Sequence, residues 1–165
     1  MVQAPMFRIG YGIDYHALQE GRRFMLGGVE IPHHKGALGH SDADVLLHAI
    51  CDALLGAVAA GDIGTHFPDT DQAYKDKDSR YFLKRCHEII HERGYEIINL
   101  DATLCLQAPK IKPYVAAMQE CISTITGLGT DCISIKATTT EQLGFVGREE
   151  GVVAHATILL GLRQG

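Results

Sequence analysis

The stretch from His40 to His48 constrains the fold of this chain more than any other. It reads His-Ser-Asp-Ala-Asp-Val-Leu-Leu-His and leads into an apolar run, a pattern typical of the start of a buried helix. Ser41, followed three residues later by Asp44, has the form of a capping box. We therefore predict a helix over residues 42–55, with Asp44 and His48 on one face and His40 just outside the first turn.

This predicted helix start is rich in groups that bind ions, because it carries two imidazoles and two carboxylates. Backbone N–H groups at a helix N-terminus favour anions, whereas imidazoles and carboxylates bind cations. The stretch therefore predicts a cleft wall that holds both a cation and a phosphate. The alternative is a well-capped core helix whose histidines have no chemical role.

The composition is that of one globular domain, which we assign to residues 1–165. Hydrophobic residues make up 46% of the chain and charged residues 21%, which argues against disorder. A chain of this size buries roughly 70% of its unfolded surface. The net charge of -5 provides no electrostatic footprint for a nucleic-acid polymer, so we expect no nucleic-acid partner.

The cysteines and the hydropathy pattern indicate where the protein works. The five cysteines are odd in number and form no C-x-x-C pair, which is typical of thiols in a reducing compartment. Residues 1–6 have no basic region followed by an apolar run, and no segment has the roughly 18 uninterrupted apolar residues of a membrane span. We therefore expect a cytoplasmic protein with no membrane partner.

Hydrophobic periodicity predicts both strands and helices. Strands are expected over residues 7–16, 23–31, 95–106, 132–138 and 152–162, the second of them broken at Gly27-Gly28. Helices are expected over residues 42–55, 79–93 and 113–126, and polar loops over residues 32–39, 62–78 and 139–151. This order predicts a single-domain α+β fold, a layered sheet with helices on one face.

The first predicted strand contributes the second half of an ion site. Asp14 and His16 are two residues apart, so both side chains leave the same face of the strand. Together with His48 they supply one oxygen and two nitrogen ligands, which suits zinc with one coordination position left open. The three residues can share an ion only if the strand and the helix meet.

A competing metal motif lies in the second predicted helix. Residues 87–91 read His-Glu-Ile-Ile-His and match the H-E-x-x-H motif of zinc proteases. The longer form of that motif requires a third histidine where this chain has Ile97. The apolar residues of the helix cluster on one face, so we expect Glu88 and His91 to point into solvent.

Two further segments carry polar groups suited to a nucleotide. Residues 136–141 end a strand with three threonine hydroxyls and Glu141, which can bind phosphate oxygens and a magnesium ion. The alternative is a threonine-rich strand end that opens a turn. Residues 106–112 form a turn with two lysines before a helix, and this turn either binds a base and a phosphate or only connects two elements.

Read together in chain order, these stretches resemble the 2-C-methyl-D-erythritol 2,4-cyclodiphosphate synthase family over nearly the whole chain. The motifs that carry the resemblance are residues 10–16, 40–44 with His48, 62–64, 67–71, 107–110, 136–141, 144–145 and 147–148.

The resemblance implies a phosphorus-oxygen lyase of the non-mevalonate isoprenoid pathway. Its substrate would be 4-diphosphocytidyl-2-C-methyl-D-erythritol 2-phosphate, and it would release CMP as the cyclic diphosphate forms. The resemblance further implies zinc on Asp14, His16 and His48, with Mg²⁺ or Mn²⁺ held by Glu141. It implies a homotrimer, assembled around the sheets, with active sites between neighbouring subunits.

The resemblance also implies roles for individual residues. His40 and Thr139 match the family's transition-state stabilisers and would be the catalytic residues. The loops at residues 62–64 and 67–71 would hold the erythritol, and residues 106–112 with Thr138 would bind cytidine for the adjoining subunit. The implied substrate-binding residues are Ser41, Asp62, Ile63, Gly64, Phe67, Pro68, Asp69, Thr70, Asp71, Leu106, Gln107, Ala108, Pro109, Lys110, Ile111, Lys112, Thr138, Thr140, Phe145 and Arg148.

Two positions depart from the family's pattern. Lys112 adds a cation near the expected nucleotide, where it either contacts the ligand or faces water. His155 stands where the family commonly places a glutamate that pairs with Arg148 at the trimer axis. Family members can hold an isoprenoid diphosphate in that axial cavity, and three imidazoles would make its binding depend on pH. The alternative is a hydrogen-bonded histidine in an apolar strand.

Two other functions remain open at this level. One is a zinc-dependent hydrolase of phosphate esters or peptides, which uses either the His48 ligand set or the H-E-x-x-H motif. The other is a non-catalytic module that binds an isoprenoid or a nucleotide and releases no CMP.

Overall fold

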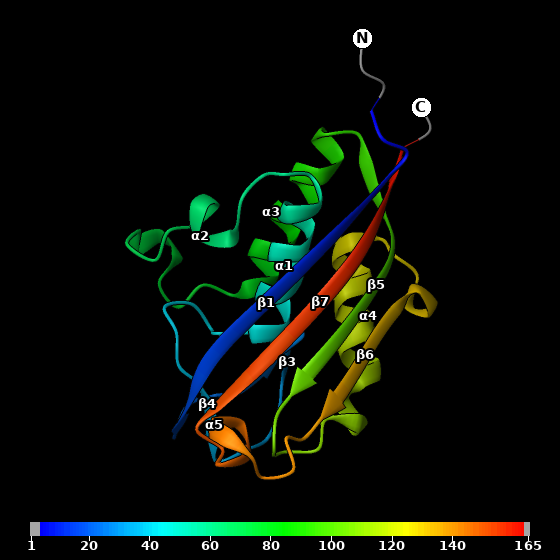
Figure 1. The fold of residues 1–165 in the computed structure, drawn as a ribbon. Coiled ribbons are helices and arrows are strands. Elements are labelled where there is room, and N and C mark those ends of the chain that lie inside the picture. The colour runs from blue at the N-terminus through cyan, green and yellow to red at the C-terminus, as the bar shows by residue number, and fades with distance from the viewer. Residues whose placement is uncertain (1–3, 164–165) are drawn as a thin grey trace.

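A five-stranded mixed sheet forms the centre of the computed structural model, which describes residues 4–163 (Figure 1). The strand order is β4-β1-β7-β5-β6; only β5 and β6 run parallel, and the other pairs are antiparallel. A separate two-stranded hairpin joins β2 to β3. The strands are β1 (Phe7–Glu20), β2 (Met25–Leu26), β3 (Val29–Glu30), β4 (Lys35–Ala37), β5 (Tyr95–Cys105), β6 (Ile133–Thr138) and β7 (Gly151–Leu162).

The three long helices lie on one face of the sheet, which confirms the predicted layered α+β fold (Figure 1). They are α1 (Val45–Ala57), α3 (Ser79–Glu92) and α4 (Val115–Thr126). The short helices are α2 (Ile63–His66), η1 (Gln72–Tyr74), η2 (Lys112–Tyr114), η3 (Thr130–Cys132) and α5 (Gly144–Gly147). Among the residues described, no helix is long and apolar enough to cross a membrane.

Two glycines of β1 allow α1 to pack directly on the strand backbone. A Cβ atom added to Gly10 would lie 1.8 Å from the carbonyl oxygen of Ala53, and one added to Gly12 would lie 2.0 Å from that of Ala49. Any larger residue at either position would therefore collide with the helix backbone. This contact fixes α1 across β1 and places the first turn of the helix beside residues 14–16.

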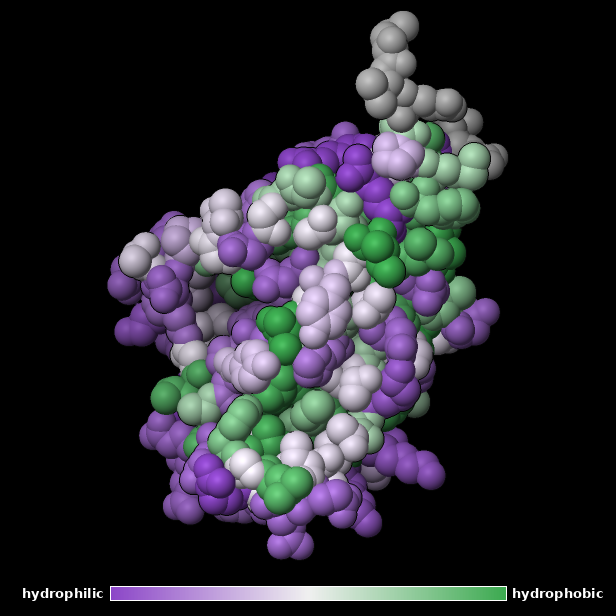
Figure 2. All heavy atoms as spheres, viewed as in Figure 1, coloured by the Kyte–Doolittle hydropathy of each residue, from purple (hydrophilic) through white to green (hydrophobic). Residues whose placement is uncertain are grey.

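The opposite face of β1 is apolar and exposed. Side chains alternate along the strand, and Phe7, Ile9, Tyr11 and Tyr15 are 58%, 72%, 58% and 56% exposed. Figure 2 shows apolar residues gathered along this face of the strands. Large exposed apolar and aromatic side chains gathered on one face mark an interaction surface in soluble proteins.

The start of α1 corrects the predicted capping box. The N-cap is Asp44, whose carboxylate accepts from the backbone N–H of Leu47, and the helix begins at Val45. The second Asp44 oxygen accepts from Gly28, and Gly27 also donates to this carboxylate, so the side chain ties the β2–β3 turn to the helix. Ser41 lies before the cap, where its hydroxyl accepts from the N–H of Ala43 and lies 3.3 Å from Nε2 of His48.

Other element boundaries also differ from the prediction. β1 continues past residue 16 to Glu20, where it pairs with β4, an edge strand in the predicted loop over residues 32–39. The predicted loop over residues 62–78 contains α2 and η1, and the turn region over residues 139–151 contains α5. The break at Gly27-Gly28 is confirmed, because both residues have positive φ in the β2–β3 turn.

Candidate functional site

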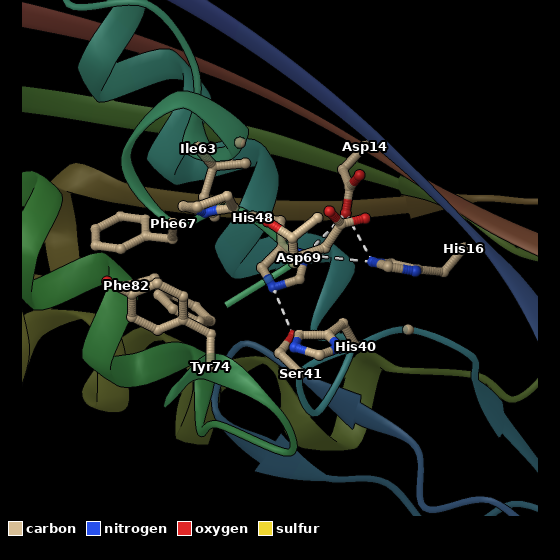
Figure 3. Close-up of a pocket in the computed structure, with 14 residues that line it drawn as sticks. Asp14, His16, His40, Ser41, His48, Ile63, Phe67, Asp69, Tyr74 and Phe82 are labelled. Carbon is tan, nitrogen blue, oxygen red and sulfur yellow. Dashed lines mark hydrogen bonds and ion pairs between the residues drawn. The ribbon is translucent and has the colours of Figure 1, made fainter. Parts of the chain in front are cut away.

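Asp14, His16 and His48 converge on one point, as the sequence predicts (Figure 3). The Oδ2 atom of Asp14 lies 3.0 Å from Nε2 of His16 and 3.1 Å from Nδ1 of His48. The two imidazole nitrogens are 3.2 Å apart. Two residues of β1 and one residue of the first turn of α1 therefore present three ligand atoms to a common centre.

Hydrogen bonds to the outer nitrogens fix the orientation of both imidazoles. Nδ1 of His16 lies 2.8 Å from the carbonyl oxygen of Leu38, which can only accept, so this nitrogen carries the proton. Nε2 of His48 lies 2.8 Å from the hydroxyl of Ser79, which itself donates to Asp42. When both rings are neutral, the inner nitrogens, Nε2 of His16 and Nδ1 of His48, carry the lone pairs that a cation would use; when a ring is protonated, its inner nitrogen donates to Asp14 instead.

The electrostatics of the centre favour a bound cation. Burial alone would raise the pKa of the Asp14 carboxyl, but hydrogen bonds from His16 and His48 hold that pKa well below its usual range. Burial likewise opposes charge on His16, yet the hydrogen bond to Asp14 raises the pKa of its imidazole. Asp14 therefore stays ionised and attracts positive charge, which either a proton or a metal ion supplies.

The donor set fits a catalytic zinc site. One carboxylate oxygen and two neutral imidazole nitrogens match the ligand types of zinc, and three protein ligands leave a fourth position open. The outer hydrogen bonds from His16 and His48 are the partners that metal-binding histidines require. The geometry supports the predicted ligand set without any change of fold.

A cavity of about 570 Å³ opens beside the three ligands. Its polar end holds the three candidate metal ligands, and its far wall is aromatic, with the rings of Phe67 and Phe82 5.0 Å apart (Figure 3). The predicted residues that line it are Asp14, His16, His40, Ser41, His48, Ile63, Gly64, Phe67, Pro68, Asp69 and Thr70. Gly39, Tyr74 and Phe82 also line it but were not predicted.

Two residues predicted to bind the sugar do not line this cavity and instead hold its rim in place. The carboxylate of Asp62 caps α2 by accepting from the N–H of Thr65, and the carboxylate of Asp71 caps η1. The carbonyl oxygen of Asp71 lies 3.3 Å from Nε2 of His40. Asp52 of α1 accepts from the N–H of Ile63, which ties the rim to the core.

A second cavity, of about 210 Å³, lies at the ends of β5 and β6. It is lined by Leu106, Gln107, Pro109, Lys110, Ile111, Lys112, Ala137, Thr138 and Thr139. Of the predicted cytidine-binding residues only Ala108 is missing from its wall, and Ala137 is the one lining residue that was not predicted. Backbone at a strand end and at a turn offers donors and acceptors to a base.

The hydroxyls and the carboxylate after β6 lie beside this second cavity. The Thr139 hydroxyl donates to Oε1 of Glu141 at a distance of 3.0 Å, and the Thr140 hydroxyl donates to the carbonyl of Leu143. Glu141 is exposed and has φ of 53°, so its backbone turns away from the sheet. The predicted magnesium ligand and a predicted catalytic hydroxyl are therefore neighbours.

The two cavities are separated within one chain. The first lies against β1 and the second lies at the end of β6, and in the sheet β7 and β5 stand between these strands. Strands are spaced about 4.8 Å apart, which places β1 and β6 about 14 Å from each other. The predicted site residues therefore form two groups that lie apart within this chain, which we refer to below as half-sites.

The residues expected at a trimer axis have partners inside the chain. Arg148 donates two hydrogen bonds to the carboxylate of Glu150, and each has a donor–acceptor distance of 3.0 Å. Nδ1 of His155 lies 2.7 Å from the hydroxyl of Tyr11. Phe145 is exposed and its ring lies 6.3 Å from that of Tyr15.

The H-E-x-x-H motif does not form a metal site. Helix α3 buries Phe82, Cys86 and Ile90 on one face, with Ile89 of the predicted apolar face half-buried. Glu88 and His91 lie outside this buried set and are half-buried, not fully exposed to solvent as expected. Among residues 4–163 no third ligand joins His91 in a metal-binding cluster. The alternative zinc protease is therefore unsupported.

Comparisons with known proteins agree with this geometry. The YgbB family model matches residues 7–161. A 2-C-methyl-D-erythritol 2,4-cyclodiphosphate synthase of Thioalkalivibrio sulfidiphilus is 56% identical over 153 residues, which are 93% of this chain and 96% of that protein. The protein of the same name from Bacillus cereus is 57% identical over 155 residues, 94% of this chain and 98% of its own.

Solved structures share the fold. The Plasmodium falciparum IspF CDP complex has a TM-score of 0.86 at 34% identity, covering 98% of this chain and all of that one (100%). The bifunctional IspDF of Campylobacter jejuni has a TM-score of 0.92 at 41% identity over 96% of this chain, which spans 43% of that longer protein. The chain thus belongs to the YgbB family, the family of the 2-C-methyl-D-erythritol 2,4-cyclodiphosphate synthases.

Proposed function

We propose that this protein converts 4-diphosphocytidyl-2-C-methyl-D-erythritol 2-phosphate to 2-C-methyl-D-erythritol 2,4-cyclodiphosphate and CMP. The convergence of Asp14, His16 and His48 at the mouth of a cavity carries this proposal, together with full-length similarity to synthases of that name. An oxygen of the 2-phosphate attacks the β-phosphorus, and the bond between that phosphorus and the bridging oxygen of CMP breaks. The protein needs no nucleophile of its own, because phosphoryl transfer depends mainly on positioning and charge neutralisation.

Asp14, His16 and His48 would hold zinc, and Glu141 would hold Mg²⁺ or Mn²⁺. Bound there, these ions would neutralise phosphate charge and act as Lewis acids toward phosphate oxygens. The hydrogen bonds that orient His16 and His48 support the zinc assignment. The contact of Glu141 with the Thr139 hydroxyl supports a shared phosphate-binding role for these two residues.

His40 and Thr139 would stabilise the charge that shifts between phosphates during the transfer. His40 and Ser41 lie in the first cavity, and Thr139 lies in the second, with Thr138. The erythritol would occupy the aromatic end of the first cavity under residues 62–71. The cytidine would occupy the second cavity, a role supported by the CDP complex of the structurally similar Plasmodium falciparum protein.

A complete active site would form between subunits of a homotrimer. The separation of the two half-sites supports this assembly, because a neighbouring chain must bring the second cavity to the first. The exposed apolar side chains on β1 offer the surface that such an assembly would bury.

Two further assignments complete the proposal, one on ligand binding and one on location. Phe145, Arg148 and His155 would line an axial cavity that accepts an isoprenoid diphosphate, and the exposure of Phe145 supports this. The protein would work in the cytoplasm, as the five unpaired cysteines suggest.

The test is to incubate the purified protein with Mg²⁺ and the diphosphocytidyl substrate and to follow phosphorus by ³¹P NMR. We expect CMP and the cyclic diphosphate in equal amounts, loss of both for His48→Ala, and near-normal turnover for His91→Ala. Release of inorganic phosphate in place of the cyclic product would identify a hydrolase. Substrate binding without CMP release would identify a non-catalytic module.

A further inference from the structure

A second group of metal-binding side chains lies outside the proposed active site. His33 and His34 precede the edge strand β4, and Glu149 lies in the turn between α5 and β7. One ligand atom from each of the three lies within 4.8 Å of the others. Nε2 of His33 is 3.9 Å from Oε2 of Glu149, and the two imidazole rings meet edge to face with centroids 4.4 Å apart.

The backbone holds these residues in place from both sides. The carbonyl of His34 accepts from the N–H of Gly21, and Lys35 begins the pairing of β4 with β1. On the other side, the side-chain ammonium of Lys35 donates to the backbone carbonyl oxygen of Glu149 at a distance of 3.0 Å. Lys35 thus bonds to the backbone of Glu149 and leaves the carboxylate of that residue available.

One nitrogen of the cluster has no hydrogen-bond partner. The side chain of His33 is only 10% exposed, and its Nε2 atom is buried without a partner among the described residues. Buried polar atoms in folded proteins nearly always have a partner, since leaving one unpaired costs its full desolvation penalty. This nitrogen faces the carboxylate of Glu149 at a distance too long for a hydrogen bond.

We propose that His33, His34 and Glu149 bind a second divalent transition-metal ion, and that zinc is the ion that fits these ligands best. Two imidazole nitrogens and one carboxylate oxygen form a zinc-type donor set. Two ligands at tetrahedral angles around zinc lie roughly 3.4 Å apart, so the 3.9 Å between His33 and Glu149 needs only a small side-chain adjustment. Water would complete the coordination, because His34 lies at the surface.

The position of this ion gives it a structural role. It would join the segment before β4 to the turn after α5, the short helix that contains Phe145 and has Arg148 as its C-cap. Neither His33 nor Glu149 touches the cavity beside Asp14. The second ion would therefore stabilise the fold at this edge without taking part in the proposed phosphoryl transfer.

The test counts zinc ions by equilibrium dialysis and mass spectrometry, without substrate. We expect two zinc ions per chain in the wild type and one in His34→Ala, in Glu149→Gln and in His48→Ala. Combining His34→Ala with His48→Ala should leave none. Activity and the far-UV circular dichroism spectrum of His34→Ala and Glu149→Gln should match those of the wild type, which shows that the loss is local.

Two control variants make the count specific. Glu150→Gln removes the neighbouring carboxylate, which pairs with Arg148, and His91→Ala removes one imidazole of the His87–His91 pair, whose rings lie 4.1 Å apart. Both variants should retain two ions. In the His48→Ala variant only the second site should bind zinc. Once the free zinc concentration exceeds the Kd of that site, each further tenfold increase should raise Tm by about 3 °C. A wild type that binds one ion, or loss of the second ion in either control but not in His34→Ala, would overturn the proposal.

Discussion

The hydroxyl of Ser79 lies 2.8 Å from Nε2 of His48 and donates its own proton to Asp42. Ser79 is the first residue of α3, whereas His48 belongs to α1, so the contact between the two helices orients a proposed metal ligand. The hydroxyl oxygen accepts from Nε2 and leaves Nδ1 free for the ion.

Replacing Ser79 by Ala should therefore weaken zinc binding by about 10-fold to 100-fold, because His48 loses the partner that fixes its proton and its orientation. Competition with a chelating dye measures the affinity. Ser41→Ala is the matched control, since its hydroxyl lies farther away, 3.3 Å from the same nitrogen. An equal or larger loss for Ser41→Ala would assign the orienting role to Ser41 instead.

Replacing Gly12 by Ala should destabilise the protein by about 2 to 3 kcal/mol, because the new Cβ atom would lie 2.0 Å from the carbonyl oxygen of Ala49. Urea unfolding measures the change. Gly56→Ala is the control within α1, because its new Cβ atom would lie 3.9 Å from the Tyr11 carbonyl oxygen, an ordinary contact. This substitution should stabilise the helix by about 0.5 to 1 kcal/mol. Tolerance of Gly12→Ala would show that α1 does not rest on the β1 backbone.

Stability should fall on the acid side of neutrality partly because of His87. Burial, and then repulsion from His91, lowers the pKa of His87 to about 4 from its ordinary value of 6.5. Between these values the unfolded chain takes up a proton that the folded chain does not, so the free energy of unfolding decreases as pH falls through this window. His87→Gln should flatten that slope between pH 6.5 and pH 4, and an unchanged slope would rule out this cause.

Mixed trimers should show that each active site uses two chains. His48→Ala damages the first half-site and Glu141→Ala the second, so each variant alone should be inactive. In a trimer that contains both variants, one of the three junctions joins two intact half-sites. Trimers that contain both variants can be purified after co-expression by a different tag on each variant, and they should recover roughly one third of wild-type activity. Mixed trimers without activity would place the whole site within one chain.

The convergence of Asp14, His16 and His48 could be predicted from sequence because local periodicity places these residues. Alternation along β1 puts Asp14 and His16 on one face, and the glycines at positions 10 and 12 indicate close approach of another element. His48 lies in the first turn of α1, at the end that this approach brings to β1.

The features that sequence reasoning missed depend on long-range contacts. Asp44 caps α1 instead of acting from inside the helix, because the turn at Gly27-Gly28 donates to its carboxylate. Strand β4 is three residues long and has no pattern of its own apart from pairing with β1. Tyr74 and Phe82 line the first cavity because their rings, with centroids 5.7 Å apart, pack together with Phe67. Residue spacing in the sequence does not predict this packing.

The most direct test of the central claim is a crystal structure of the zinc-loaded protein with diffraction data from both sides of the zinc absorption edge. The account predicts an anomalous peak within bonding distance of Oδ2 of Asp14, Nε2 of His16 and Nδ1 of His48, and its disappearance in His48→Ala. Zinc-loaded wild-type crystals with no anomalous density between these three atoms would contradict it.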